Sequence, residues 1–121
     1  MHYTFSEKGF AGDLTISKIS ACDVKQELGC SSRKVYKLEL TTADQQAGHT
    51  CDVSAVENDA ARITTGSVID ATFSARVDDE AAPVSFSVEF DTKKAVISGD
   101  PSLQSSFCGL NGVFLGTWRK R

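Results

Sequence analysis

Few residues in this chain could carry out hydrolytic chemistry. Nucleophilic catalysis by serine or cysteine needs a nearby histidine and a carboxylate that orients it. His49 is the only histidine away from the start of the sequence, and Thr50 and Asp52 are among its neighbours. No Gly-x-Ser-x-Gly motif is present. We therefore predict no catalytic residues and expect a protein that is not an enzyme.

The sequence also lacks the motifs that are typical of metal-binding and phosphate-binding sites. The chain has no Cys-x-x-Cys pair and no Gly-x-x-x-x-Gly-Lys motif, so neither a zinc ribbon nor a P-loop is predicted. Asp78, Asp79 and Glu80 are adjacent acids, but they lack the Asp-x-Asp-x-Asp-Gly spacing of a calcium loop. We expect no metal and no cofactor, and we interpret the three acids as a solvated hairpin tip that could contact a partner.

The four cysteines are the most informative residues of the sequence. An even number in a small chain is typical of a disulfide framework in an oxidising compartment. Cys22 and Cys30 bracket a nine-residue segment that Gly29 could help to close, which leaves Cys51 to pair with Cys108. The alternatives are the other two connectivities and four reduced thiols in a cytosolic protein. The disulfide interpretation predicts a periplasmic or secreted protein, although residues 1–10 do not look like a signal peptide.

Length and charge limit the function classes further. The chain has 121 residues and a net charge of −3, which suits one domain and disfavours a nucleic-acid partner. No apolar run approaches the roughly 18 residues of a transmembrane helix. Oligomeric state is left open.

The segments that must position any site show a period of two. In 69–77 and 84–90, apolar residues alternate with polar ones, and the same alternation occurs in 14–16, 36–40 and 51–55. This pattern predicts antiparallel strands with one buried face. About eight strands in a single domain over 1–121 would form a β-barrel or a β-sandwich.

Turn signals separate these strands. Asp78–Pro83 is expected to join two long strands, 91–94 to form a polar turn, and 98–101 to end a strand. Asn111-Gly112 predicts a tight hairpin that pairs 107–110 with 113–118. Helix is expected in at most one or two short turns, at 24–28 and 56–62.

Trp118 and Arg119 differ from the other aromatic and basic residues because they stand together near the end of the sequence. Most aromatic residues fall on apolar strand faces and are expected in the core. Trp118, in Gly-Thr-Trp-Arg-Lys-Arg, is expected to cap one end of the barrel with Arg119 stacked on its ring.

Two motifs together resemble a known group of proteins. They are Gly-His-Thr-Cys-Asp-Val at 48–53 and Phe-Cys-Gly-Leu-Asn-Gly-Val-Phe-Leu-Gly-Thr-Trp at 107–118. The pattern, over roughly residues 33–121, resembles small bacterial periplasmic or secreted β-proteins, some of them grouped with inhibitors of lysozyme-type enzymes. The resemblance implies an exported domain and a Cys51–Cys108 pairing. The chain departs from many of these proteins in lacking a cysteine within 84–90.

Three functions follow as hypotheses. The first is a non-enzymatic exported protein that binds a basic cell-wall-degrading enzyme or toxin, as an inhibitor or immunity-type partner, through Asp78, Asp79, Glu80, Trp118 and Arg119. The second is a carrier whose small interior residues, such as Ala55, Ala71 and Ala75, leave room for an apolar ligand. An interior filled by large aromatic side chains would exclude this second hypothesis. The third is a surface antigen or structural envelope module without a discrete ligand.

Overall fold

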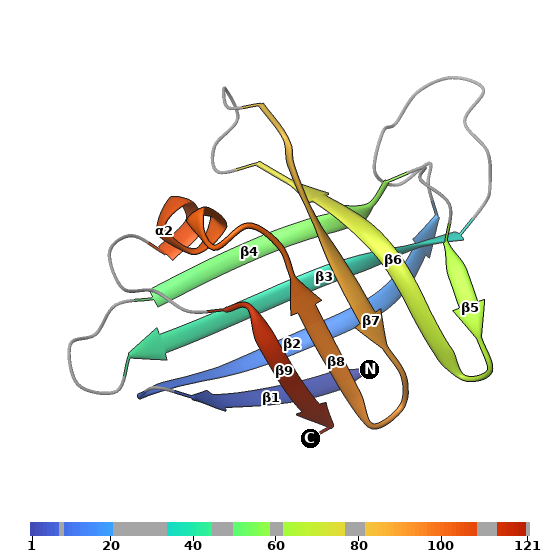
Figure 1. Ribbon diagram of the computed structural model, residues 1–121, viewed down its shortest axis with the longest axis horizontal. Helices are drawn as coiled ribbons and strands as arrows, with labels where there is room; N and C mark the ends of the chain where they lie inside the picture. Colours follow the sequence, from blue (N-terminus) through green and yellow to red (C-terminus); the bar gives the residue numbers. More distant parts are fainter. Residues whose placement is uncertain are drawn as a thin grey trace.

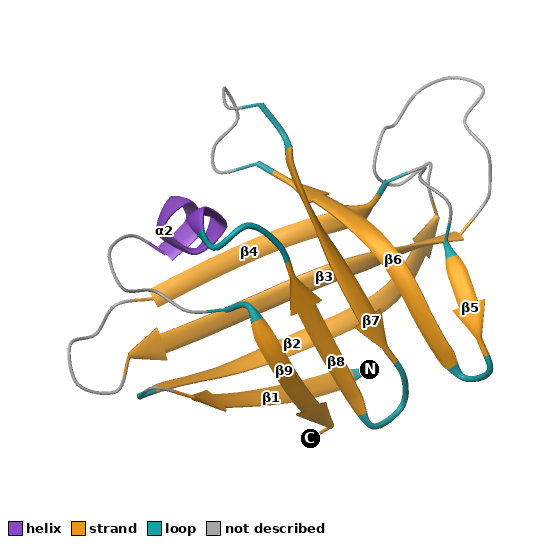
Figure 2. Ribbon diagram, in the orientation of Figure 1, coloured by secondary structure: helices purple, strands orange, loops and turns teal. Residues whose placement is uncertain are grey.

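The computed structural model describes residues 1–7, 9–20, 34–44, 50–58, 62–76, 82–108 and 114–120. Within these residues the chain forms strands and one short helix, α2 (Figures 1 and 2). The strands are β1 (His2–Glu7), β2 (Phe10–Ser20), β3 (Lys34–Asp44), β4 (Thr50–Glu57), β5 (Ile63–Thr65), β6 (Val68–Ala75), β7 (Val84–Phe90), β8 (Lys94–Ser98) and β9 (Gly116–Lys120). The expected all-β, antiparallel fold is confirmed.

Eight of these strands close into a barrel. Neighbouring strands follow the order β4-β3-β2-β1-β9-β8-β7-β6, and β4 pairs with β6 to complete the ring. Every pairing in the ring is antiparallel. Figure 1 shows β1–β4 crossing β6–β9 on the two sides of the barrel. Because hydrogen bonds close the ring of strands, the architecture is the β-barrel and not the β-sandwich that was its alternative.

The predicted alternation selects the buried face correctly. Along β3, Tyr36, Leu38 and Leu40 are buried whereas Glu39 is exposed. Large side chains fill the centre of the barrel, since five aromatic residues have an exposed fraction below 2%; they are Tyr3, Phe73, Phe90, Phe114 and Trp118. Gly12 makes room for one of them, because a Cβ there would stand 3.0 Å from Cη2 of Trp118 and 2.5 Å from the Thr41 carbonyl oxygen.

Helix α2 (Ser102–Cys108) lies against β4 and was not expected. The Asp100 side chain accepts a hydrogen bond from the Ser102 N–H at 2.9 Å, and Pro101 immediately precedes the helix. Hydrogen bonds from the backbone and the side chain of Ser102 hold the pKa of Asp100 below its usual value. Leu103 is buried on the barrel side of the helix, near Gly99 and Phe86.

This helix corrects the hairpin predicted around Asn111-Gly112. Residues 107 and 108 belong to α2, and β9 pairs with β8 and β1 instead. Asn111 and Gly112 themselves lie outside the described residues. The helical turn expected at 56–62 is also wrong where the structure describes it, because Val56 and Glu57 end strand β4. The turn expected at 24–28 lies outside the described residues.

The predicted turns around β8 are confirmed. Asp91 accepts hydrogen bonds from the N–H groups of Lys93 and Lys94, at 2.7 and 2.9 Å, in the turn between β7 and β8. The segment 84–90 pairs with 69–75, so the acidic segment Asp78–Pro83 does connect two paired strands. Across the described residues, no helix is long and apolar enough to span a membrane.

Candidate functional site

Strand β5 and the turn that joins it to β6 stand outside the closed ring of the barrel, whereas β6 itself belongs to the ring. All three residues of β5 are exposed, and their pairings are with the first residues of β6, from Ile63↔Asp70 to Thr65↔Val68. Gly66 has a φ of +61° in the two-residue turn, a value that glycine adopts at little cost. β5 ends the strand order, so its second edge has no partner strand among the described residues. The hairpin therefore offers an exposed edge and exposed side chains.

An ion pair between the exposed Arg62 and the buried carboxylate of Glu57 fixes this hairpin to the barrel. Glu57, the last residue of β4, has an exposed fraction of only 8%. Nε of Arg62 donates a hydrogen bond to Oε2 of Glu57 at 2.8 Å, and Nη2 donates a second one to Oε1. The Glu57 carboxylate also accepts the Tyr36 N–H at 3.1 Å. Because Arg62 immediately precedes β5, the pair holds the start of β5 against the end of β4.

The Tyr36 ring extends this anchor. The Arg62 guanidinium lies 4.6 Å from the centre of the ring, and the Lys18 ammonium lies 5.5 Å from it. On the core side, the ring meets Phe90 edge-on, with centroids 5.0 Å apart. The hydrogen bond to Glu57 raises the pKa of Arg62 above its already high value, so the guanidinium stays charged. Glu57 and Arg62 therefore form a structural anchor, which positions the hairpin.

A groove of about 250 Å³ lies between this hairpin and β7, lined by Ile63, Thr65, Val68, Asp70 and Glu89. Asp70 and Glu89 are direct cross-strand partners on β6 and β7, and both are exposed. Like charges in this register repel one another. Ile63, at 61% exposure, is the most exposed large hydrophobic residue in the described part of the chain.

The groove combines features that suit a basic side chain. Two carboxylates that repel one another are stabilised when a cation binds between them. The aliphatic stem of a lysine or arginine could pack on Ile63 and Val68 while its charged end reaches Asp70 and Glu89. No cluster of three or more His, Cys, Asp or Glu residues suited to a metal occurs in the ranges that the structure describes.

The predicted partner-binding residues are not brought together at this groove. Trp118 was expected at the barrel end as a contact residue, but it is completely buried, and this expectation is wrong. Its ring stacks on Phe5 with centroids 4.7 Å apart, and its Nε1–H donates a hydrogen bond to the Phe114 carbonyl oxygen at 3.0 Å. Arg119 is exposed on β9, where successive side chains point to opposite faces, so it does not stack on Trp118. Asp78, Asp79 and Glu80 lie outside the described residues.

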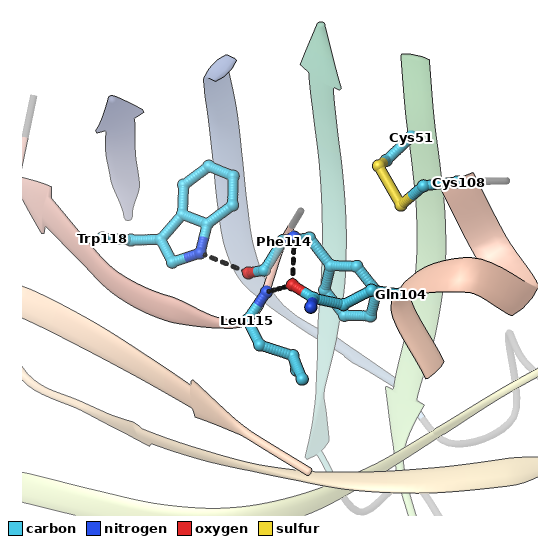
Figure 3. Close-up of a disulfide and its surroundings, with 6 residues drawn as sticks. All are labelled: Cys51, Gln104, Cys108, Phe114, Leu115 and Trp118. Carbon is cyan, nitrogen blue, oxygen red and sulfur yellow. Dashed lines mark hydrogen bonds between the residues drawn. A yellow bond between two sulfur atoms is a disulfide. The ribbon is translucent and has the colours of Figure 1, made fainter. Parts of the chain in front are cut away.

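The cysteine prediction is confirmed where the structure describes it. Cys51 of β4 and Cys108 at the end of α2 form a disulfide, which links residues 57 positions apart (Figure 3). Cys22 and Cys30 lie outside the described residues, as does His49. Close to the disulfide, the side-chain oxygen of Gln104 accepts the N–H groups of Phe114 and Leu115, at 2.9 and 3.0 Å (Figure 3). These bonds attach α2 to the segment that leads into β9.

Among the described residues, large aromatic side chains occupy the interior where a carrier would need space. Phe73, Phe86 and Phe90 are at most 2% exposed, and the rings of Phe73 and Phe86 stack with centroids 6.3 Å apart. Phe86 also meets Phe114 edge-on at 6.2 Å. The small residues named for the carrier hypothesis, such as Ala71, pack among these aromatic rings.

The groove was missed at the level of the sequence, although one signal for it was present. Gly66-Ser67 between Ile63-Thr64-Thr65 and Val68-Ile69 is a pattern typical of a two-residue hairpin turn. The pairing of Asp70 with Glu89 depends on the register of β6 and β7, which no local motif specifies.

Comparison of the chain with known protein families, with curated proteins and with solved structures gives no match in any of the three.

Proposed function

We propose that this protein is a non-enzymatic exported binding protein, which acts as an inhibitor or immunity-type partner of a basic cell-wall-degrading enzyme or toxin. The observation that carries the proposal is the groove beside β5. It places the Asp70 and Glu89 carboxylates next to the exposed Ile63. A basic side chain flanked by apolar surface on the partner complements this arrangement in both charge and shape.

The rigidity of the barrel supports binding through the outer surface. The interior is filled by aromatic side chains, and α2 is fastened to β4 by the Cys51–Cys108 disulfide. The Glu57–Arg62 pair fixes the base of the β5–β6 hairpin. A preorganised surface loses little conformational entropy on binding, which is the requirement for tight inhibition by a small domain.

The disulfide supports the proposed compartment. Disulfides persist in oxidising environments and are rare in the cytosol. The Cys51–Cys108 bond therefore suggests an exported location, and we propose the periplasm or the extracellular medium as its site of action.

The test is a binding titration with a basic lysozyme at several salt concentrations, combined with a lysis assay. We expect binding that weakens steeply as salt rises, and slower lysis in the presence of the protein. Asp70→Asn/Glu89→Gln should weaken binding at least tenfold, since two charge-assisted contacts are lost. Ile63→Ser should weaken it without changing the salt dependence.

The matched control is Glu39→Gln/Asp52→Asn, which removes the same charge from exposed positions on β3 and β4. It should bind as the unchanged protein does. Equal weakening by both double variants would show that only net charge matters and would overturn the role of the groove. Salt-independent binding, or no binding to any of a panel of basic wall hydrolases, would overturn the proposed function.

A further inference from the structure

Four basic residues meet at one rim of the barrel, on three neighbouring segments. Lys93 and Lys94 occupy the turn between β7 and β8 and the start of β8, and Arg119 and Lys120 are the last residues of β9. Lys94 and Arg119 are cross-strand partners, and the Lys120 N–H donates a hydrogen bond to the Lys93 carbonyl oxygen at 2.8 Å. Figure 1 shows the end of β9 close to the turn between β7 and β8. We call these four residues the basic rim.

The described acids balance only part of the positive charge of the basic rim. All four residues are exposed, and none forms an ion pair with a described residue. Lys94 and Arg119 face one another as like charges, which is unfavourable without a bound anion. Asp91 lies in the same turn, where its carboxylate accepts two backbone N–H groups and attracts Lys93 and Lys94, and Glu89 pairs with Val96 on the neighbouring stretch of β8. These bonds lower the pKa of Asp91, which stays ionised and leaves the rim with an excess of positive charge.

The directions of the side chains indicate the shape of the partner. Consecutive residues of a strand point to opposite faces, so Arg119 and Lys120 point to opposite sides of β9. Lys94 shares the face of Arg119, whereas Lys93 belongs to the turn itself. A linear polymer lying along one face would contact only part of this set. A layer of anionic headgroups that surrounds the tip of the rim could reach all four cations.

We propose that the basic rim docks the protein on an anionic lipid surface, with the strand ends of β8 and β9 pointing into the headgroup layer. The net charge of −3 makes this a local attraction, in which the rim faces the membrane. The attachment is peripheral and reversible, because the rim supplies charge without an apolar helix to insert. The groove adjoins the rim, because Glu89 pairs with Val96, two residues from Lys94. The docking uses other residues than Asp70 and Glu89, so it does not depend on the proposed inhibitor function.

The experiment is cosedimentation of the whole protein with vesicles of phosphatidylglycerol and phosphatidylcholine in equal parts. We expect binding at low salt that is lost at high salt, and no binding to pure phosphatidylcholine. Each basic residue near an anionic surface contributes roughly fivefold to partitioning, so Lys94→Ser/Arg119→Ser should lower it roughly 25-fold. Circular dichroism checks that the variant is folded, and both positions are exposed on the outer face of the barrel.

The control is Lys34→Ser/Lys37→Ser, which removes the same charge from β3, three strands away from β9 in the barrel order. It should lower partitioning far less than the rim variant. No binding to anionic vesicles, or equal losses in the two variants, would overturn the proposal. Binding to a soluble polyanion such as heparin without binding to vesicles would also overturn it, and would favour a linear polymer as the ligand.

Discussion

Arg62 binds Glu57 through both carboxylate oxygens, and this contact joins the last residue of β4 to the residue immediately before β5. The ion pair thereby holds β5, a strand of only three residues outside the barrel ring, at the edge of the ring strand β6. An isolated hairpin of this size would not be stable in water. The ion pair therefore contributes to the stability of the barrel and also sets the position of β5, which lines the groove.

Removal of Arg62 should be costly because it leaves the Glu57 carboxylate buried without its cation. We expect Arg62→Ala to lower the free energy of unfolding by about 2–3 kcal/mol, as measured by urea denaturation. A double-mutant cycle with Glu57→Gln should give a coupling energy above about 1 kcal/mol. The exposed pair Lys37–Glu39, with an N–O distance of 2.9 Å, is the control, and its coupling should stay below about 1 kcal/mol. Equal coupling in the two pairs would contradict the anchoring role.

The Cys51–Cys108 disulfide should stabilise the protein mainly by restricting the unfolded chain. It closes a loop of 57 residues, for which chain entropy predicts a contribution of about 4 kcal/mol. Cys51→Ala/Cys108→Ala should therefore unfold at much lower urea concentration. The double variant is preferable to chemical reduction, which would also act on Cys22 and Cys30. Peptide mapping without reductant should recover the 51–108 linkage, and finding Cys51 joined to another cysteine would refute the pairing.

The strands of this fold could be predicted because their alternation is local and strict. The segment 84–90 shows this best, since Phe86, Val88 and Phe90 are all buried and the polar residues between them are exposed. Its partner strand was also correct, because a short charged connection favours pairing of the two strands that it joins.

The errors lie where non-local contacts decide the structure. The hairpin signal at Asn111-Gly112 gave the wrong partner for β9, because barrel closure requires β9 to pair with β8 and β1. Asp100-Pro101-Ser102 is a helix-start pattern, but the helix that follows is too short to show a clear apolar periodicity. The groove was not predicted because it needs the register of two ladders at once, which places Ile63, Asp70 and Glu89 together.

The burial of Trp118 can be measured directly, since it is the only tryptophan of the sequence. We expect blue-shifted fluorescence emission and little quenching by iodide, because the ring is inaccessible to solvent. Trp118→Phe should lower the free energy of unfolding by about 2–4 kcal/mol, through the cavity and the lost hydrogen bond to Phe114. Strong iodide quenching in the folded protein would restore the exposed position that the sequence suggested.

Tyr3 should make stability depend on pH in the alkaline range. Its hydroxyl is buried and donates a hydrogen bond to the Asp91 carbonyl oxygen, and burial together with the Asp91 charge raises the pKa of Tyr3 to about 12. The neutral form is thus favoured in the folded state, whereas the unfolded chain ionises near the ordinary tyrosine pKa of about 10. The contribution of the Tyr3 hydroxyl to the free energy of unfolding is fully present below pH 10 and is lost as the pH rises towards 12.

Urea denaturation across this pH range should show a steeper loss of unfolding free energy in the unchanged protein than in Tyr3→Phe. That variant should start about 1 kcal/mol less stable at neutral pH, since it lacks the hydroxyl. Parallel pH profiles for the two proteins would show that Tyr3 ionises equally in the folded and unfolded states.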